Sequence, residues 1–264
     1  MSESFKKWLD GFKGAFNFKE LFENAANNLG FLGVCLGIFA ALLLTALLFE
    51  RFVMKERRRR FSDTHFIIYT ALFSAMAAVL MLLEFPLTFI APQFYKIDFS
   101  ELPVLICTFY LGPVAGVTSE LIKIVLKLII RGTSTFFVGD FANFAVGCAF
   151  VLPASMIYHS RPGKRTALIG LTLGTIIMTV FGSAFNGLYL IPKFAQMFGG
   201  LDTIIGMSSK VNENITGIWS LVFISVVPFN LIKGVLVSAL TFLLYKRISP
   251  LMHKGDSTRR MKKR

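Results

Sequence analysis

Charged residues are scarce in this chain of 264 residues. Asp, Glu, Lys and Arg together make up 16% of it, whereas they make up about a quarter of a typical soluble domain. Hydrophobic residues make up 55% of the chain, and its mean hydropathy is +0.65. Several apolar runs reach the roughly 20 residues that a helix needs to cross the hydrocarbon core of a bilayer. The composition therefore excludes an ordinary soluble domain and predicts a protein that crosses a membrane several times.

Residues and motifs of the common catalytic and metal sites are also few or absent. Cys35, Cys107 and Cys148 lie within apolar runs without paired spacing, which argues against a disulfide framework or a metal cluster. The three histidines are far apart in the sequence. The chain has neither H-E-x-x-H nor G-x-S-x-G, which argues against an intramembrane enzyme. It also lacks G-x-x-x-x-G-K-[ST], so any ATP-driven step would need another subunit.

Positive charge exceeds negative charge, and the net charge is +13. Three short basic blocks, which follow or separate apolar runs, lie at 51–60, 161–165 and 246–264. Aromatic residues do not alternate with these basic residues as they do in sites for single-stranded nucleic acid, so no nucleic-acid partner is expected. Basic blocks in alternate connections instead follow the positive-inside rule and mark the cytoplasmic side.

Seven apolar segments predict membrane spans, and together with the basic blocks they predict a topology. The spans are expected at 31–49, 65–85, 102–111, 114–130, 141–158, 167–191 and 218–245. In this arrangement every basic block falls in the cytoplasm, the N-terminus lies outside and the C-terminus is cytoplasmic. The segments 85–103, 131–140 and 192–216 are then outer loops.

We therefore predict an all-α integral membrane protein with a six-helix core over 65–247 and one extra N-terminal transmembrane helix. Residues 31–64 supply the extra helix and a basic linker, and 248–264 form a basic cytoplasmic tail. Residues 1–30 carry apolar residues at helical spacing with lysines between them. This pattern is typical of a helix in the membrane interface, and equally of a helix docked on the protein's own surface.

Polar side chains occur inside the predicted spans, where they are costly. In the last span, "SVVPFNLIKG" carries Asn230 and Lys233 on one helical face just after Pro228. A charged side chain near the bilayer centre costs about 2.5–3.5 kcal/mol and needs a partner or a cavity. In "SELIKIVLKLIIRG", Glu120 and Lys123 also share a face. They either neutralise one another or contact a ligand, and both interpretations stay open here.

Further polar groups enter the neighbouring spans at middle to outer depth. Asp140 and Asn143 lie on one face of the span that begins with "GDFANFAVG", and Asn186 lies in the following span. Asp140 alternatively caps the start of its helix. Aromatic residues such as Phe89 and Tyr95 lie in the nearby outer loop. An apolar pocket with an aromatic rim and few polar groups suits a flat, polar-edged organic molecule better than an ion.

Three stretches, taken in order, resemble one family. "EFPLTFIAPQFYKIDFSELPVLICTFYLGPVAGVTSELIK", "GDFANFAVGCAFVLPASMIY" and "VPFNLIKG" resemble the riboflavin-binding S component of energy-coupling-factor (ECF) vitamin transporters. The likeness extends over the core, 65–247, whereas the extension 1–60 is not part of the minimal family core. The outer loop 192–216 is longer than the resemblance implies.

The resemblance implies a small membrane protein, not an enzyme, that captures riboflavin from outside and holds no cofactor apart from this transported ligand. It implies association with a transmembrane coupling protein and two ATPase subunits. Ala71 and Ala75 match the alanine pattern that faces the coupling protein in that family. The ligand is expected under the loop 86–98. The residues expected to bind it are Phe85, Leu87, Phe89, Tyr95, Glu120, Lys123, Asp140, Asn143, Asn186, Asn230 and Lys233.

Other functions stay open on the sequence. An S component for FMN or FAD would use Lys96, Lys127 and Arg131, near the outer mouth, to meet a phosphate. An S component for another vitamin would keep the same fold. A structural or lipid-binding membrane protein would have its buried polar side chains paired only among themselves.

Overall fold

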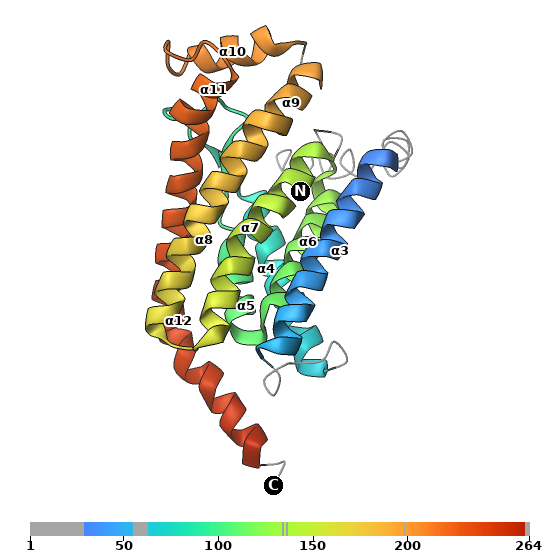
Figure 1. Cartoon of the computed structure of the whole chain (residues 1–264), viewed down its shortest axis with the longest axis vertical. Coiled ribbons are helices and arrows are strands. Elements are labelled where there is room, and N and C mark those ends of the chain that lie inside the picture. The colour runs from blue at the N-terminus through green and yellow to red at the C-terminus, as the bar shows by residue number, and fades with distance from the viewer. Residues whose placement is uncertain (1–28, 55–62, 134, 136, 198, 262–264) are drawn as a thin grey trace, which may run out of the picture.

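The computed structural model describes residues 29–54, 63–133, 135, 137–197 and 199–261, with side chains described within 33–245. Helices stand side by side along the longest axis of the molecule (Figure 1). Within these residues, five helical stretches are long and apolar enough to cross a membrane: Gly33–Phe52, Thr64–Leu82, Val138–Ser160, Lys164–Met197 and Ile218–Tyr245. The predicted fold class is confirmed. The predicted interfacial helix and most of the first and last basic blocks lie outside the described side chains.

The helices follow the predicted order of spans. The extra helix is α3 (Leu29–Phe52), and the core contains α4 (Thr64–Leu82), α5 (Glu101–Leu111), α6 (Pro113–Arg131), α7 (Val138–Ser160), α8 (Lys164–Phe185) and α12 (Val227–Met261). Two helices fall short of the criteria for a long apolar span, because α5 has 11 residues and α6 carries four charged residues. They pack against each other and against α4 within the bundle.

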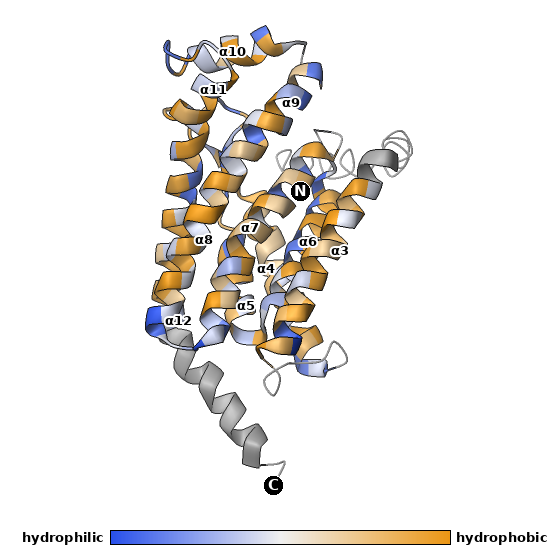
Figure 2. Cartoon of the chain, viewed as in Figure 1, coloured by the Kyte–Doolittle hydropathy of each residue, from blue (hydrophilic) through white to orange (hydrophobic). Residues whose placement is uncertain are grey.

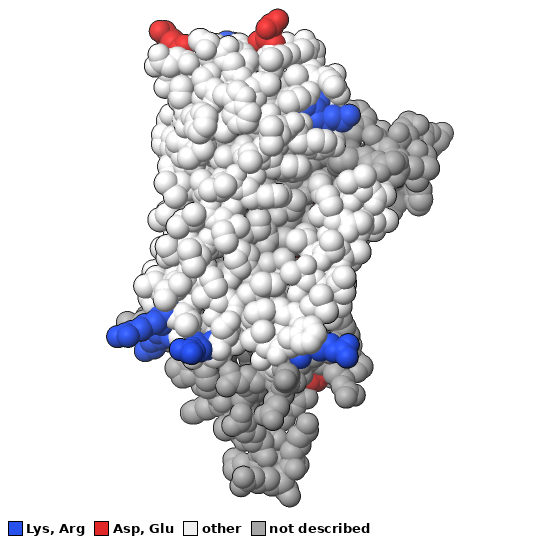
Figure 3. Space-filling model, in the orientation of Figure 1, with Lys and Arg blue, Asp and Glu red and all other residues white. Residues whose placement is uncertain are grey.

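The outward-facing surface of the bundle is apolar. Hydrophobic residues cover the visible faces of α3, α8 and α12 (Figure 2). A broad band without charged side chains separates basic side chains, at the lower end where α7 ends and α8 begins, from acidic side chains at the upper end near α10 (Leu201–Ser209) (Figure 3). This band matches the apolar belt that a bilayer requires.

The predicted outer loop at 192–216 is largely helical, which corrects that prediction. Helix α8 continues through a π-helical turn, η1 (Asn186–Leu190), into α9 (Ile191–Met197), and α10 begins after Gly199 and Gly200. Both glycines have positive φ, 86° and 108°, a conformation that other residues rarely adopt. The chain therefore leaves the helical path at this pair, while the residues on both sides stay helical.

Two more irregular segments interrupt the helices near the polar residues of the sequence. The α4–α5 loop contains a short antiparallel pair, β1 (Phe85–Pro86) and β2 (Lys96–Ile97). Before α12, α11 (Ile218–Leu221) leads into a second π-helical turn, η2 (Val222–Val226). Pro228 follows this turn, and a wide turn suits a proline because it has no N–H and crowds the carbonyl of the preceding turn. Such turns are frequent at functional sites.

The extra helix α3 packs against α6 and α7, and its Phe39 and Ala46 belong to the same hydrophobic cluster as Val114. Near its end, Glu50 is 1% exposed, and its Oε1 accepts the backbone N–H of Val114 at 3.0 Å. At Gly112, where φ is 119°, a Cβ would come within 2.5 Å of this oxygen. Glu50 therefore caps the first turn of α6, where the helix dipole favours a carboxylate.

Replacing Glu50 by Leu removes the acceptor of a buried N–H, which typically costs about 1–3 kcal/mol. We expect the Glu50→Leu variant to unfold at a lower temperature in detergent. Glu50→Gln retains a carbonyl oxygen and should keep most of the stability. Leu44→Ala, at a position of α3 that is 56% exposed, serves as the control. An unchanged unfolding temperature for Glu50→Leu would show that the cap does not stabilise the protein.

Candidate functional site

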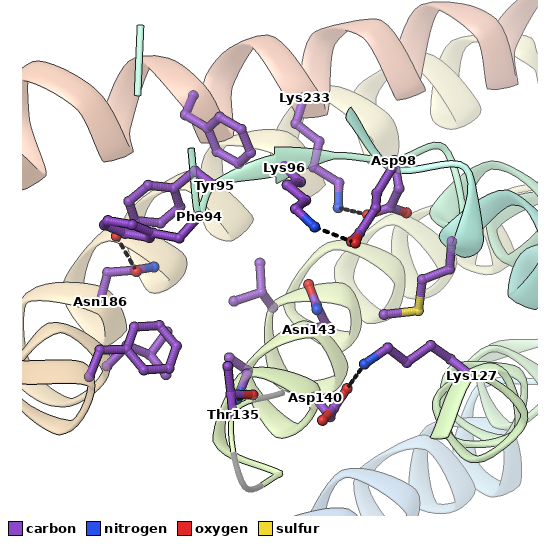
Figure 4. A pocket seen from close by; sticks show the side chains of 18 of the residues that line it. Phe94, Tyr95, Lys96, Asp98, Lys127, Thr135, Asp140, Asn143, Asn186 and Lys233 are labelled. Atoms are coloured by element: carbon purple, nitrogen blue, oxygen red, sulfur yellow. Dashed lines mark hydrogen bonds and ion pairs between the residues drawn. The ribbon is translucent and has the colours of Figure 1, made fainter. Parts of the chain in front are cut away.

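A cavity of about 410 Å³ lies between the α4–α5 loop, α6, α7, η1 and α12, which is within the range of roughly 300–1,000 Å³ for ligand pockets. Side chains from these separate elements point into it (Figure 4). Its polar lining consists of Glu84, Tyr95, Lys96, Asp98, Lys127, Arg131, Thr135, Asp140, Asn143, Asn186, Asn230 and Lys233. Its apolar lining includes Met81, Phe94, Phe194 and Phe229.

One wall of the cavity carries a buried lysine that is held by two carboxylates. Nζ of Lys233, on α12, lies 3.0 Å from Oδ2 of Asp98 and 3.2 Å from Oε2 of Glu101. Asp98 belongs to the α4–α5 loop and Glu101 to the first turn of α5. All three side chains are buried. A lysine buried inside a membrane-spanning bundle needs a carboxylate partner. For Lys233, both partners come from a segment that is remote in the sequence.

A second wall carries Asp140, in the first turn of α7. Its carboxylate accepts hydrogen bonds from Nζ of Lys127 and from Oγ1 of Thr133, the latter at 2.7 Å. Nζ of Lys127 also donates to the carbonyl oxygen of Gly132 at 3.2 Å. The N-cap position of α7 is Phe137, so Asp140 is not the cap itself. It lies at the positive end of the helix dipole and links α7 to α6.

An aromatic wall is built around Tyr95. Its hydroxyl donates to Oδ1 of Asn186 at 2.8 Å, and Nδ2 of Asn186 donates to the carbonyl oxygen of Gly182 at 2.7 Å. The ring centroid of Tyr95 lies 4.7 Å from that of Phe94 and 5.6 Å from that of Phe229. These spacings are typical of packed aromatic pairs. The two polar groups of Asn186 thus hold the loop against η1.

Two other amides, Asn143 and Asn230, line the cavity. Asn143 points into the cavity (Figure 4) and is exposed there. Asn230 is 6% exposed, and its Nδ2 has no hydrogen-bond acceptor among the described residues. A buried donor without an acceptor typically costs about 1–3 kcal/mol. Asn143 therefore offers an amide to a molecule in the cavity, whereas Nδ2 of Asn230 is itself buried and lies 3.1 Å from the position of a Cβ on Gly182.

The edge of the cavity is crossed by an ion-pair network. Oε1 of Glu84 accepts from Nζ of Lys96 at 2.7 Å and from Nη1 of Arg131 at 2.9 Å. A second cavity of about 770 Å³ adjoins the first, and Phe94 and Lys96 line both. Among the described residues, no three His, Cys, Asp or Glu side chains are grouped to hold a metal ion. The arrangement is one for binding an organic molecule.

The structure brings together six of the eleven residues that the resemblance predicted to bind riboflavin. Those that line the cavity are Tyr95, Asp140, Asn143, Asn186, Asn230 and Lys233. Those that do not line it are Phe85, Leu87, Phe89, Glu120 and Lys123. Phe85 and Phe89 are 45% and 76% exposed, and Leu87 packs against the cluster that contains Phe229. Ligand contact by the six residues that line the cavity stays a prediction.

Sequence reasoning missed the acidic partners of Lys233. Asp98 and Glu101 lie next to a predicted span, where charged residues are common and attract no notice. The signal that points to them is the requirement that a lysine inside the bundle be neutralised. Phe229 was missed as a ring partner of Tyr95, because phenylalanine is abundant in this chain, with 29 residues.

Residues 65–245 match the model of one family, the substrate-specific component of ECF transporters. The chain belongs to this family. The match begins in α4 and ends in α12, so this S component shares its whole helical core with the family. The helix α3 precedes the matched residues. The protein is therefore the substrate-binding membrane subunit of an ECF transporter, with one added helix.

Named relatives and a solved structure are similar to the same part of the S component. It is 32% identical to the riboflavin transporter RibU of Staphylococcus aureus over 199 residues, 75% of this chain and 98% of RibU. It is 31% identical to the riboflavin transporter FmnP of Bacillus subtilis, over 72% of this chain and 95% of FmnP. A solved S component of a bacterial ECF transporter has a TM-score of 0.57 and 31% identity, covering 72% of this chain and 99% of that one.

The contact between Tyr95 and Asn186 generates a prediction for the free S component. Tyr95→Phe removes the hydroxyl that donates to Asn186, and such a hydrogen bond typically contributes about 0.5–1.5 kcal/mol. We expect the α4–α5 loop to open more often, so that trypsin cleaves after Lys96 several times faster. Phe89→Leu, in the same loop but away from both cavities, should cleave as the unsubstituted protein does. Equal rates for all three proteins would contradict this role of Tyr95.

Proposed function

We propose that this S component captures riboflavin from outside the cell for ATP-driven uptake. The observation that carries the proposal is the cavity, which combines an aromatic wall with amide donors. Two relatives at 31–32% identity are named riboflavin transporters, which supports this choice of ligand. The expected partners are a transmembrane coupling protein and two ATPase subunits, because the chain has no phosphate-binding loop of its own.

The chemistry of riboflavin matches the walls of the cavity. Its isoalloxazine ring is flat and can pack against the rings of Tyr95 and Phe229, which lie 5.6 Å apart. One edge of that ring carries carbonyl oxygens, and the ribityl chain carries hydroxyls. Donors for these oxygens are available from Asn143, Asn230 and Lys233. Riboflavin is in this view the transported ligand, and no cofactor is required.

An uncharged flavin fits better than a phosphorylated one. The three cations considered for a phosphate already have carboxylate partners, since Lys96 and Arg131 pair with Glu84 and Lys127 pairs with Asp140. A phosphate at the cavity edge would compete with these carboxylates and would lie near their negative charge. Riboflavin therefore remains the proposed ligand, ahead of FMN and FAD.

Basic side chains support the proposed orientation in the cell membrane. Arg51 lies in the last turn of α3, Arg161 follows α7, and Lys164 and Arg165 begin α8. Basic side chains gather at this lower end in Figure 3. By the positive-inside rule this end faces the cytoplasm. The C-terminus is then cytoplasmic, the N-terminus lies outside, and the larger cavity near α10 faces the outside.

We further propose that α4 contacts the coupling protein through Ala71 and Ala75. Both alanines are exposed, and their neighbours Leu72 and Met76 are 52% and 47% exposed. Small residues at this spacing let another helix approach closely. An apolar helix face with two small residues one turn apart suits a transmembrane helix of the coupling protein.

Purified protein should bind riboflavin and quench its fluorescence, and mass spectrometry of the released ligand should identify riboflavin. Replacing Asn230 by Leu removes an amide from the cavity lining, so we expect about tenfold weaker binding, as for a loss of roughly 1.4 kcal/mol. Asn214→Ala, an exposed amide outside both cavities, is the matched control. Absence of riboflavin binding by the unsubstituted protein would refute the proposed function.

Enlarging the alanines of α4 should separate capture from transport. Ala71→Leu combined with Ala75→Leu adds bulk at both positions and blocks close approach of another helix, so the variant should bind riboflavin normally and fail to co-purify with the coupling protein. Uptake into cells that express all subunits should fall at least tenfold. Val180→Leu, on a part of α8 that is 64% exposed, should leave uptake unchanged. Normal uptake by the double variant would exclude this surface as the contact.

A further inference from the structure

Five charged side chains form one continuous buried chain that starts at the cavity and leads away from it. The front pair, Lys233 and Asp98, lines the cavity. Glu101 follows, 3.2 Å from Lys233 and 3.3 Å from Lys123. Behind it lies the rear pair, Lys123 and Glu120, whose Nζ and Oε2 are 2.7 Å apart. Lys123 and Glu120 are both 0% exposed, so the rear pair has no access to solvent or to a ligand in the cavity.

Glu101 is the shared member of this chain. Its carboxylate lies within ion-pair distance of both ammonium groups, and the two ammonium groups repel each other across it. Lys123 also donates to Oγ of Ser100 at 3.0 Å, next to Glu101 in sequence. Charges in a low-dielectric interior interact strongly and are costly to leave unpaired. A change in the rear pair must therefore shift Glu101, and Lys233 must respond.

The rear pair is held in place by the shape of its surroundings. A Cβ on Gly147 of α7 would come within 2.5 Å of Oε2 of Glu120, so the carboxylate lies directly against the backbone of that helix. The same helix carries Asn143 and Asp140 into the cavity. The position of Glu120 is thus fixed by α6 and α7 together, and Lys123 is fixed by Glu120.

We propose that Glu120 and Lys123 are positioning residues for ligand capture. They do not touch the ligand. They hold Glu101, and Glu101 with Asp98 holds the Lys233 ammonium at the cavity wall in the position that receives an oxygen of the ligand. This inference rests on the proposed function, because it assigns to the rear pair an effect on the affinity for riboflavin that passes through Lys233.

A double-mutant cycle tests whether the rear pair affects ligand binding through Glu101 and Lys233. The rear pair is replaced by Lys123→Met with Glu120→Gln, and the front pair by Lys233→Met with Asp98→Asn. Each replacement removes one positive and one negative charge, so the formal charge of the network is the same in the unsubstituted protein and in all three variants. In the doubly replaced protein Glu101 has lost both of its ammonium partners, so the unfolding temperature of each variant is measured as well. The dissociation constant for riboflavin is measured for each protein by fluorescence quenching and calorimetry. Val125→Ala, on a part of α6 that is 44% exposed, is the control.

We expect the rear-pair substitution to weaken binding about tenfold when the front pair is intact. When the front pair is already replaced, the same substitution should change the dissociation constant less than about twofold. Equal losses in both backgrounds would mean a general structural role and would overturn the proposal, and so would unchanged binding in the intact background. No binding by the unsubstituted protein would overturn the proposed function and this inference with it.

A second cycle covers the case in which the front-pair variant binds too weakly to measure. Glu101→Gln takes the place of the front-pair substitution. If the rear pair acts through Glu101, combining its substitution with Glu101→Gln should weaken binding no more than the larger of the two separate losses. If the two losses of affinity multiply, the rear pair and Glu101 contribute independently, and the proposed action of the rear pair through Glu101 is rejected.

Discussion

The burial of Lys233 is the constraint on which the rest of the site depends. An ammonium group inside an apolar bundle is tolerated only beside carboxylates that neutralise it. Asp98 and Glu101 meet this need at 3.0 and 3.2 Å. The α4–α5 loop must therefore return into the bundle, and α5 must begin at the depth of the lysine. The shortness of α5, with 11 residues, follows from this requirement.

The same loop that neutralises the lysine also builds the aromatic wall. Tyr95 lies three positions before Asp98, and its hydroxyl reaches Asn186 on η1 while Asp98 reaches α12. The ordered loop thus makes two polar contacts at once: Asp98 neutralises Lys233 on α12, and Tyr95 donates a hydrogen bond to Asn186 on η1. A ligand in the cavity would therefore meet the ring of Tyr95 and the ammonium group of Lys233. The α4–α5 loop supplies the first and holds the second through Asp98, so this short loop shapes much of the pocket.

Sequence reasoning succeeded where the signal was local. Asn230 and Lys233 are visible because polar residues in an apolar run are costly, and periodicity places them on one face. Their partners are non-local, so Asp98 and Glu101 were not found. For Glu120 and Lys123, the neutralising pair was one of two interpretations, and the structure contains it at 2.7 Å. The segment 192–216 was predicted as an outer loop, whereas much of it is helical, in α9 and α10.

The added helix α3 is integrated into the core without covering the face proposed for coupling. Its Glu50 supplies the acceptor that the first turn of α6 lacks within the core itself, and Gly112 leaves the space for that carboxylate. Because α6 carries Glu120 and Lys123, the cap stabilises the helix that holds the rear pair. Helix α3 packs on α6 and α7, while the two alanines of α4 stay exposed. A seventh helix is therefore compatible with both the pocket and the proposed contact with a coupling protein.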